Sequence, residues 1–201
     1  MYLLFLNETS RISRFWPILT TVGNHESTLP KSMYLFENSF VIGRLSTADH
    51  IYERVQTYRF VNRTTFVFFD PFLEIYNNSS PQNYSVMKTS IQQHLIEARE
   101  KFPDEFAIMA SHYPVMCSQD DPHCRDAMKN MPDLYEWLST PYKGKGLVDL
   151  YIGSHMHQYE RIWPLVNNKF VNESSPYYRG RLANFVEAVG GVNYFIIEKY
   201  Y

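Results

Sequence analysis

Two short apolar runs, each followed at once by a loop that carries histidine, constrain the fold of this chain most strongly. Phe106–Ala110 runs into Ser111 and His112, and Leu147–Ile152 runs into a loop that contains His155. Short buried strands have this length and composition. Ligands of open α/β sheets bind outside the carboxyl ends of the strands. Both histidine loops are therefore predicted to lie where a binding site would form.

The remaining segments support alternation of strands and helices. Ile91, Leu95 and Ala98 share one face of a helix predicted over Met87–Phe102, and Pro103 ends that helix. Further predictions are a helix over Leu134–Leu138, strands over Tyr58–Val61, Thr65–Phe69 and Phe185–Val189, a polar loop over Asn77–Asn83, and an amphipathic N-terminal helix with Leu3, Leu6, Ile12 and Phe15 on one face. The fold class is predicted as α/β, with one domain over residues 1–201.

Charge and hydropathy exclude two classes of partner. The 201 residues carry a formal net charge of −2, which does not favour a nucleic-acid surface. No apolar run reaches the roughly 20 residues that a membrane-spanning helix needs. The short apolar run at residues 2–6 is also shorter than the core of a signal peptide. We expect neither nucleic-acid binding nor a membrane span.

Cysteines and glycosylation sequons point to an oxidising compartment. Cys117 and Cys124 stand close enough in a polar stretch for a local disulfide, and two free thiols are the alternative. Asn-X-Ser/Thr occurs six times, at Asn7, Asn62, Asn77, Asn78, Asn83 and Asn172. Each is an acceptor pattern for N-glycosylation, although an Asn- and Ser-rich composition would also produce some of them. A secreted or lysosomal, lumenal setting is expected.

Three polar segments carry the candidate chemistry: Gly23-Asn24-His25-Glu26, Ser111-His112-Tyr113-Pro114 and His155-Met156-His157. A His-X-His segment alone is as consistent with a structural role as with metal binding. An asparagine amide oxygen together with imidazoles from separate loops is a less common set. Imidazole binds Zn, Fe, Mn and Cu. Asn24, His112, His155 and His157 are therefore the candidate metal ligands.

These segments resemble the calcineurin-like metallophosphoesterases, and within them the purple acid phosphatases of the acid phosphatase type 7 group. Residues 23–26 match the family's GNH[DE] box, and residues 108–114 match the strand and histidine loop before its "HxP". Asp149–Arg161 (DLYIGSHMHQYER) is similar to its "DLxxxGHxHxYER" box, and Cys117 and Cys124 look like its "PMYCS…C" loop. The resemblance implies the C-terminal part of a four-layer αββα fold, a β-sandwich flanked by helices, without its first strands.

The resemblance also implies a dinuclear metal centre that hydrolyses phosphate monoesters by a metal-activated hydroxide, that is, an acid phosphatase. Asn24, His112 and His155 would hold a divalent Zn, Mn or Fe ion, and His157 would bind Fe(III). His25 would be the catalytic residue that contacts the phosphate or protonates the leaving oxygen. Glu26 would orient His25 or a ligand.

Several departures from the family pattern change the expectation for this chain. The family's DxG and GDxxY boxes lie upstream of GNH, and the 23 residues before Asn24 contain no Asp. Two aspartates and the tyrosine ligand are thus absent, so the ferric site would keep His157 alone. We expect an N-terminally incomplete chain that forms no purple centre by itself. Ser154 replaces a family glycine, which we expect to be tolerated.

Three functions remain open at this point. The first is an acid phosphatase of which this chain is a part. The second is an inactive pseudoenzyme or binding module with the same fold. The third is a phosphodiesterase of the same superfamily. For the neighbouring residues, a structural role is expected at Asp149 and in the Tyr159-Glu160-Arg161 segment, where these side chains would brace the His-X-His turn.

Overall fold

The structure is a computed structural model of the chain. It describes residues 2–15, 18–21, 23–24, 55–60, 64–69, 81–116, 122, 131, 133–143, 145–157, 159–162, 165–167, 169–170 and 184–187.

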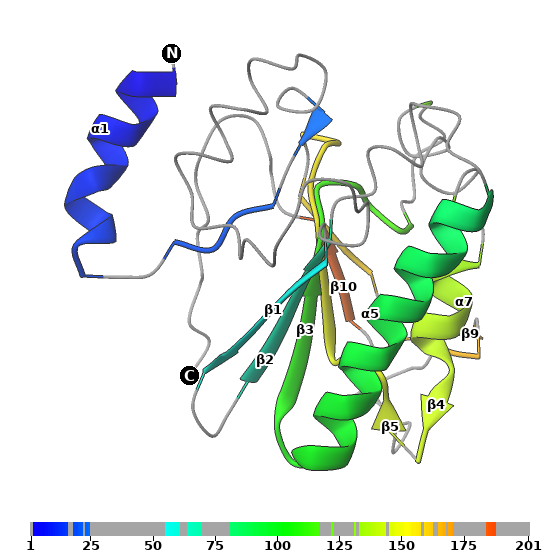
Figure 1. Ribbon diagram of the computed structural model, residues 1–201. Coiled ribbons are helices and arrows are strands. Elements are labelled where there is room, and N and C mark those ends of the chain that lie inside the picture. The colour runs from blue at the N-terminus through cyan, green and yellow to red at the C-terminus, as the bar shows by residue number, and fades with distance from the viewer. Residues whose placement is uncertain are drawn as a thin grey trace.

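A six-stranded mixed sheet forms the centre of the fold, in the order β1-β2-β3-β6-β10-β7 (Figure 1). These strands span Val55–Phe60 (β1), Thr64–Phe69 (β2), Phe106–Ala110 (β3), Leu150–Gly153 (β6), Asn184–Glu187 (β10) and Glu160–Ile162 (β7). The four inner strands run parallel, whereas β1 and β7 are antiparallel to their neighbours. The predicted α/β class is confirmed.

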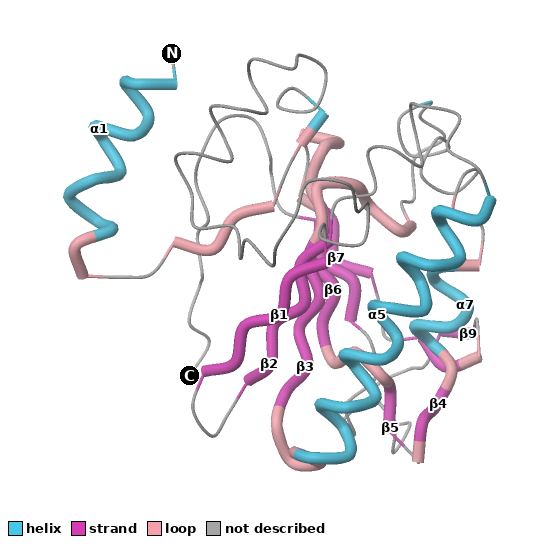
Figure 2. The backbone as a smooth tube through the Cα atoms, in the orientation of Figure 1, coloured by secondary structure: helices cyan, strands magenta, loops and turns pink. Residues whose placement is uncertain are grey.

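Three helices and two small hairpins complete the described elements (Figure 2). The helices are α1 (Tyr2–Ser13), α5 (Pro81–Lys101) and α7 (Leu134–Ser139), and the hairpins pair β4 (Pro141–Tyr142) with β5 (Lys145–Gly146) and β8 (Leu165–Val166) with β9 (Lys169–Phe170). Helix α5 links β2 to β3 and packs against β1, β2 and β3. Lys88 of α5 forms an ion pair with Asp133, the residue before α7, so the start of α7 lies beside α5. No described helix is long and apolar enough to cross a membrane.

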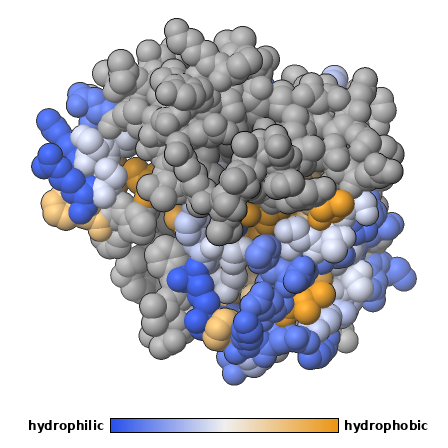
Figure 3. All heavy atoms as spheres, viewed as in Figure 1, coloured by the Kyte–Doolittle hydropathy of each residue, from blue (hydrophilic) through white to orange (hydrophobic). Residues whose placement is uncertain are grey.

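The main core lies between the sheet and α5. Residues of β2 alternate in burial, so Val67 and Phe69 are buried while Phe66 and Phe68 are half-buried. This alternation follows from the two-residue repeat of a strand. Met87, Ile91 and Leu95 of α5 join Val67, Phe69, Met109 and Tyr151 in one buried cluster. Each such side chain contributes roughly 1.5–3 kcal/mol when it leaves water. Hydrophilic residues dominate the outer side of this region (Figure 3).

The largest differences from the predicted boundaries are at the starts of β1, α5 and β6. Strand β1 begins at Val55 rather than at Tyr58. Helix α5 begins at Pro81 rather than at Met87, so Asn83 is helical and not part of a polar loop. Proline has a φ suited to the first helical position, and this start signal outweighs the polar composition. Strand β6 begins at Leu150 rather than at Leu147. Before it, the Asp149 side chain accepts the hydrogen bond of the Ala107 N–H, where a regular ladder would use a backbone carbonyl.

Candidate metal centre

Both histidine loops leave the sheet at the same edge. His112 follows the end of β3 by two residues, and His155 follows the end of β6 by two residues. These strands are adjacent and parallel. Two hydrogen bonds continue the pairing into the loops: Ser111 N–H donates to the Ile152 carbonyl at 3.1 Å, and Ser154 N–H donates to the His112 carbonyl at 3.0 Å. The prediction that both loops begin at the carboxyl ends of strands is confirmed.

Asn24 reaches the same edge from a segment far away in the sequence. Thr21 Oγ1 donates a hydrogen bond of 3.1 Å to the carbonyl oxygen of Phe69, the last residue of β2. Because β2 is the neighbour of β3, this contact anchors residues 18–21 beside the His112 loop. Gly23 is buried and Asn24 is half-buried. Gly23 and Asn24 are therefore held at the carboxyl edge of the sheet.

Polar atoms of Asn24, His112 and His155 meet at this edge. His112 Nε2 lies 2.8 Å from Asn24 Oδ1 and 3.0 Å from His155 Nδ1. All three side chains are half-buried. One proton on His112 Nε2 cannot serve both neighbours fully, because a neutral imidazole nitrogen has a single N–H to donate. Three atoms that can each act as a metal ligand when unprotonated thus converge at one place.

This set of atoms fits a divalent cation. Two nitrogen or oxygen ligands bound to one Zn²⁺ in tetrahedral geometry lie about 3.4 Å apart, given metal–ligand distances of roughly 2.0–2.1 Å. The observed separations of 2.8 and 3.0 Å are shorter. An ion would therefore require the atoms to separate by about half an ångström. Within the described residues, no group of three or more His, Cys, Asp or Glu side chains is placed to hold a metal, and here the third atom comes from an asparagine.

The backbone of the His155 loop bends sharply. His155 has a φ of 74° and His157 a φ of 49°, both in the left-handed region. Such a conformation costs a residue with a side chain roughly 1–2 kcal/mol, and strained residues cluster at functional sites. Ser154 is not among the described residues with positive φ. Its backbone therefore does not need the family's glycine, which explains why serine is accommodated there.

Tyr113 and Tyr151 support the histidines, and sequence reasoning assigned no role to either. The Tyr113 ring is fully buried and contacts both imidazoles, with ring centroids 5.0 Å from His112 and 4.7 Å from His155. The Tyr151 hydroxyl donates to the Tyr113 carbonyl at 2.7 Å and lies 2.7 Å from Ser111 Oγ. These contacts fix the His112 loop against β6. The sequence signal was the alternation in β6, which sends Tyr151 to the buried face.

Gly153 allows the two loops to approach closely. A Cβ atom at this position would lie 3.0 Å from Pro114 Cα and 3.5 Å from the Tyr113 carbonyl oxygen. Real Cβ atoms rarely come so close to backbone atoms. Glycine at the end of β6 thus permits the His155 loop to lie directly on the His112 loop. This is a second feature that sequence reasoning did not assign.

His157 stands apart from the other three predicted ligands. Its side chain is exposed, and no hydrogen bond within the described part of the chain joins it to Asn24, His112 or His155. Tyr159 is 67% exposed, and Arg161 is exposed as well. Neither side chain is buried against the turn, and the role of the Tyr159-Glu160-Arg161 segment in bracing it stays a prediction.

Several predicted residues lie outside the described part of the chain: His25, Glu26, Cys117, Cys124, Asn62, Asn77, Asn78 and Asn172. Asn7 is exposed on α1, and the backbone of Asn83 lies in α5. Comparison of the sequence with models of known protein families gives no match, and comparison with curated protein sequences gives none either. The roles of these residues stay predictions.

Proposed function

We propose that Asn24, His112 and His155 hold one divalent metal ion of a metallophosphoesterase centre. The observation that carries this proposal is a convergence of three atoms at the carboxyl edge of the parallel strands. His112 Nε2 lies 2.8 Å from Asn24 Oδ1 and 3.0 Å from His155 Nδ1. Imidazole nitrogen and amide oxygen suit Zn, Mn or Fe(II). The described sheet would be one of the two sheets of a four-layer αββα fold.

The proposed activity is hydrolysis of phosphate monoesters, as in the purple acid phosphatases that the sequence resembles. When bound, a metal pair neutralises charge on the phosphoryl oxygens and acidifies water. The chain's own contribution is placement: Gly153 brings the two loops together, and Tyr113 and Tyr151 hold the His112 loop. His25, the sequence neighbour of Asn24, is the proposed residue that contacts the phosphate. A second ion, Fe(III), would use His157 together with ligands from other residues.

A second candidate function is a metal-binding module without turnover. The observation that favours it is the exposure of His157, which is not hydrogen bonded to the Asn24–His112–His155 cluster in the described residues. That arrangement provides one ion with ligands but does not provide for two. A single bound ion with a neutral ligand set can bind a phosphate without hydrolysing it.

Phosphatase assays near pH 5 with added Zn²⁺ and Fe³⁺ test the proposal. They would compare p-nitrophenyl phosphate with bis(p-nitrophenyl) phosphate as substrates of the chain. Turnover of the monoester that disappears in His112→Ala supports the proposed activity. Preference for the diester favours a phosphodiesterase. Bound Zn²⁺ without turnover favours the binding module.

A further inference from the structure

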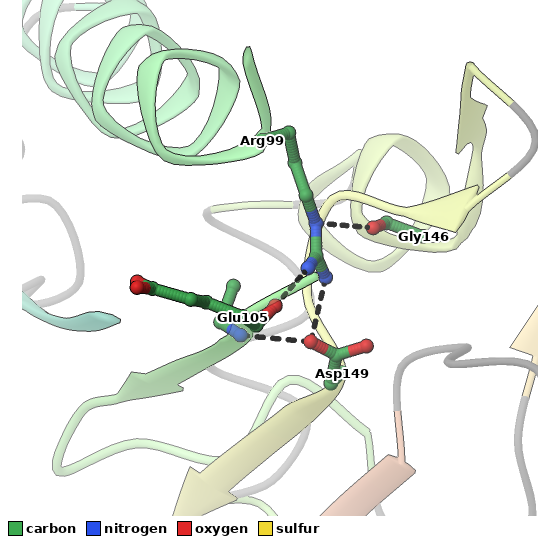
Figure 4. Close-up of polar contacts among 5 residues, drawn as sticks. Arg99, Glu105, Gly146 and Asp149 are labelled. Carbon is green, nitrogen blue, oxygen red and sulfur yellow. Dashed lines mark hydrogen bonds and ion pairs between the residues drawn. The ribbon is translucent and has the colours of Figure 1, made fainter. Parts of the chain in front are cut away.

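A buried ion pair lies at the opposite ends of the two strands that carry the histidines. Arg99 of α5 and Asp149, the residue before β6, have side chains that are only 4% and 6% exposed, and Arg99 Nη2 lies 2.7 Å from Asp149 Oδ2 (Figure 4). No role in metal binding or phosphate chemistry falls to this pair, since it lies at the amino-terminal ends of β3 and β6. Its contacts nevertheless reach both strands.

Asp149 joins the beginning of β6 to the beginning of β3 through both its backbone and its side chain. Its N–H donates to the Ala107 carbonyl at 2.8 Å, and its Oδ2 accepts from the Ala107 N–H at 2.7 Å. Both backbone groups of Ala107 are therefore bound by one residue. This extends the β3–β6 pairing, which runs from Ile108 opposite Leu150 to Ala110 opposite Ile152, by one step.

Arg99 adds a third element to the same junction. Its guanidinium donates through Nε to the Gly146 carbonyl at 3.0 Å and through Nη1 to the Glu105 carbonyl at 2.8 Å. Glu105 directly precedes β3, and Gly146 ends β5. The planar guanidinium has donors in fixed directions, so it sets relative positions more strictly than a flexible ammonium group would. Helix α5 thus fixes where both strands begin.

The register of β3 against β6 is weakly specified by the strands themselves. Ile108, Met109 and Ala110 pair with Leu150, Tyr151 and Ile152, all without charge. A shift by two residues keeps every side chain on its original face, so an apolar pattern opposes it poorly. Such a shift would move the strands by about 6.6 Å. The 3.0 Å approach of His112 Nε2 to His155 Nδ1 would then be lost.

We propose that the Arg99–Asp149 pair is a positioning device, which sets the register of β3 against β6 and so holds His112 beside His155. A buried ion pair is weak evidence of net stability, because removing both charges from water offsets their attraction. Conformational specificity is the better reason for its presence here. The consequence for metal affinity rests on the proposed function, whereas the juxtaposition of the two imidazoles does not.

The test compares wild type with three variants of the chain by NMR without metal. Wild type should show through-space ring contacts between His112 and His155, whose centroids lie 5.0 Å apart. Arg99→Met/Asp149→Leu removes both charges and leaves neither unpaired. We expect it to fold, with the ring cross-peak reduced at least about twofold and faster amide exchange at Ser111 and Ser154, which lie at the far end of the pairing. The control is Glu97→Gln/Lys101→Met, which removes an exposed ion pair from the same helix and should change nothing.

Asp149→Asn is the second variant, because it keeps the volume and one oxygen that can accept from Ala107. Its ring cross-peak should fall between those of wild type and the double variant. Unchanged cross-peaks in folded variants overturn the proposal, and so does loss of folding in both, since the pair would then serve stability alone. A Zn²⁺ titration of the same samples forms a separate arm. Failure of the wild type to bind Zn²⁺ would count against the proposed function, and the NMR result would still decide the positioning role.

Discussion

The Nε2 atom of His112 lies 3.0 Å from the Nδ1 atom of His155, although 43 positions separate the two residues in the sequence. Adjacent parallel strands bring them together, because each histidine follows its strand by two residues. Asn24 completes the group from a segment that Thr21 ties to the end of β2. The candidate centre is therefore a product of sheet topology, with short loops that leave little freedom to the side chains.

Gly153→Ala should destabilise the protein by about 1–3 kcal/mol, because the added methyl would overlap backbone atoms of the buried Pro114 loop. Thermal or urea unfolding would measure the loss. Ser154→Ala is the matched control one position later, where no close approach is involved, and it should stay within about 0.5 kcal/mol of wild type. If Gly153→Ala were as stable as wild type, the His112 loop, which contains Pro114, would be able to move away from the added methyl at little energetic cost.

Tyr151→Phe should lower the free energy of unfolding by about 1–2 kcal/mol, because the Tyr113 carbonyl and Ser111 Oγ lose a buried hydroxyl partner. Urea denaturation provides the measurement. Tyr142→Phe makes the same chemical change at an exposed hydroxyl, which donates to Glu100, and should leave the midpoint nearly unchanged. If the two variants behave alike, the Tyr151 hydroxyl does not support the His112 loop.

Glu100→Gln should remove a small stabilisation that depends on pH. Hydrogen bonds from Lys143 and Tyr142 lower the pKa of the Glu100 carboxyl below its ordinary value of 4.5. A lowered pKa in the folded state means that the stabilisation is present above pH 4.5 and is lost as the pH falls through the folded value. Urea midpoints of variant and wild type should therefore differ slightly at neutral pH, and the difference should shrink as the pH falls below 4.5. A difference that grows in acid would contradict this account.

Much of the fold could be predicted from residue patterns. The apolar runs at residues 106–110 and 147–152 predicted two of the central strands, and the spacing of Ile91, Leu95 and Ala98 predicted the main helix. The start of α5 was predicted too late in the sequence. The prediction gave more weight to the polar residues around Pro81 than to the preference of proline for the first helical position. The start of β6 was also predicted wrongly. The Ala107 N–H donates to the side chain of Asp149, where a regular strand pair would use a backbone carbonyl.

The candidate site was predicted in part. Strand ends placed His112 and His155 correctly, since parallel neighbours share an edge. His157 was assigned to a second ion rather than to this group; its side chain is exposed after the left-handed bend at His155 and His157, and its role as a ligand stays a prediction. The roles of Tyr113, Tyr151 and Gly153 depend on contacts between the His112 loop and β6. These contacts join residues far apart in the sequence, and no local pattern predicts which residues make them.

The most direct test of the central claim is calorimetric titration of the apo chain with Zn²⁺ at neutral pH. We predict one equivalent bound per chain, with affinity reduced at least about 100-fold in His112→Ala and in His155→Ala, because loss of a ligand should cost no less than loss of a supporting residue. His94→Ala, a histidine on α5 outside the site, should bind as wild type does. Binding that is unaffected by the His112 and His155 substitutions would contradict the account.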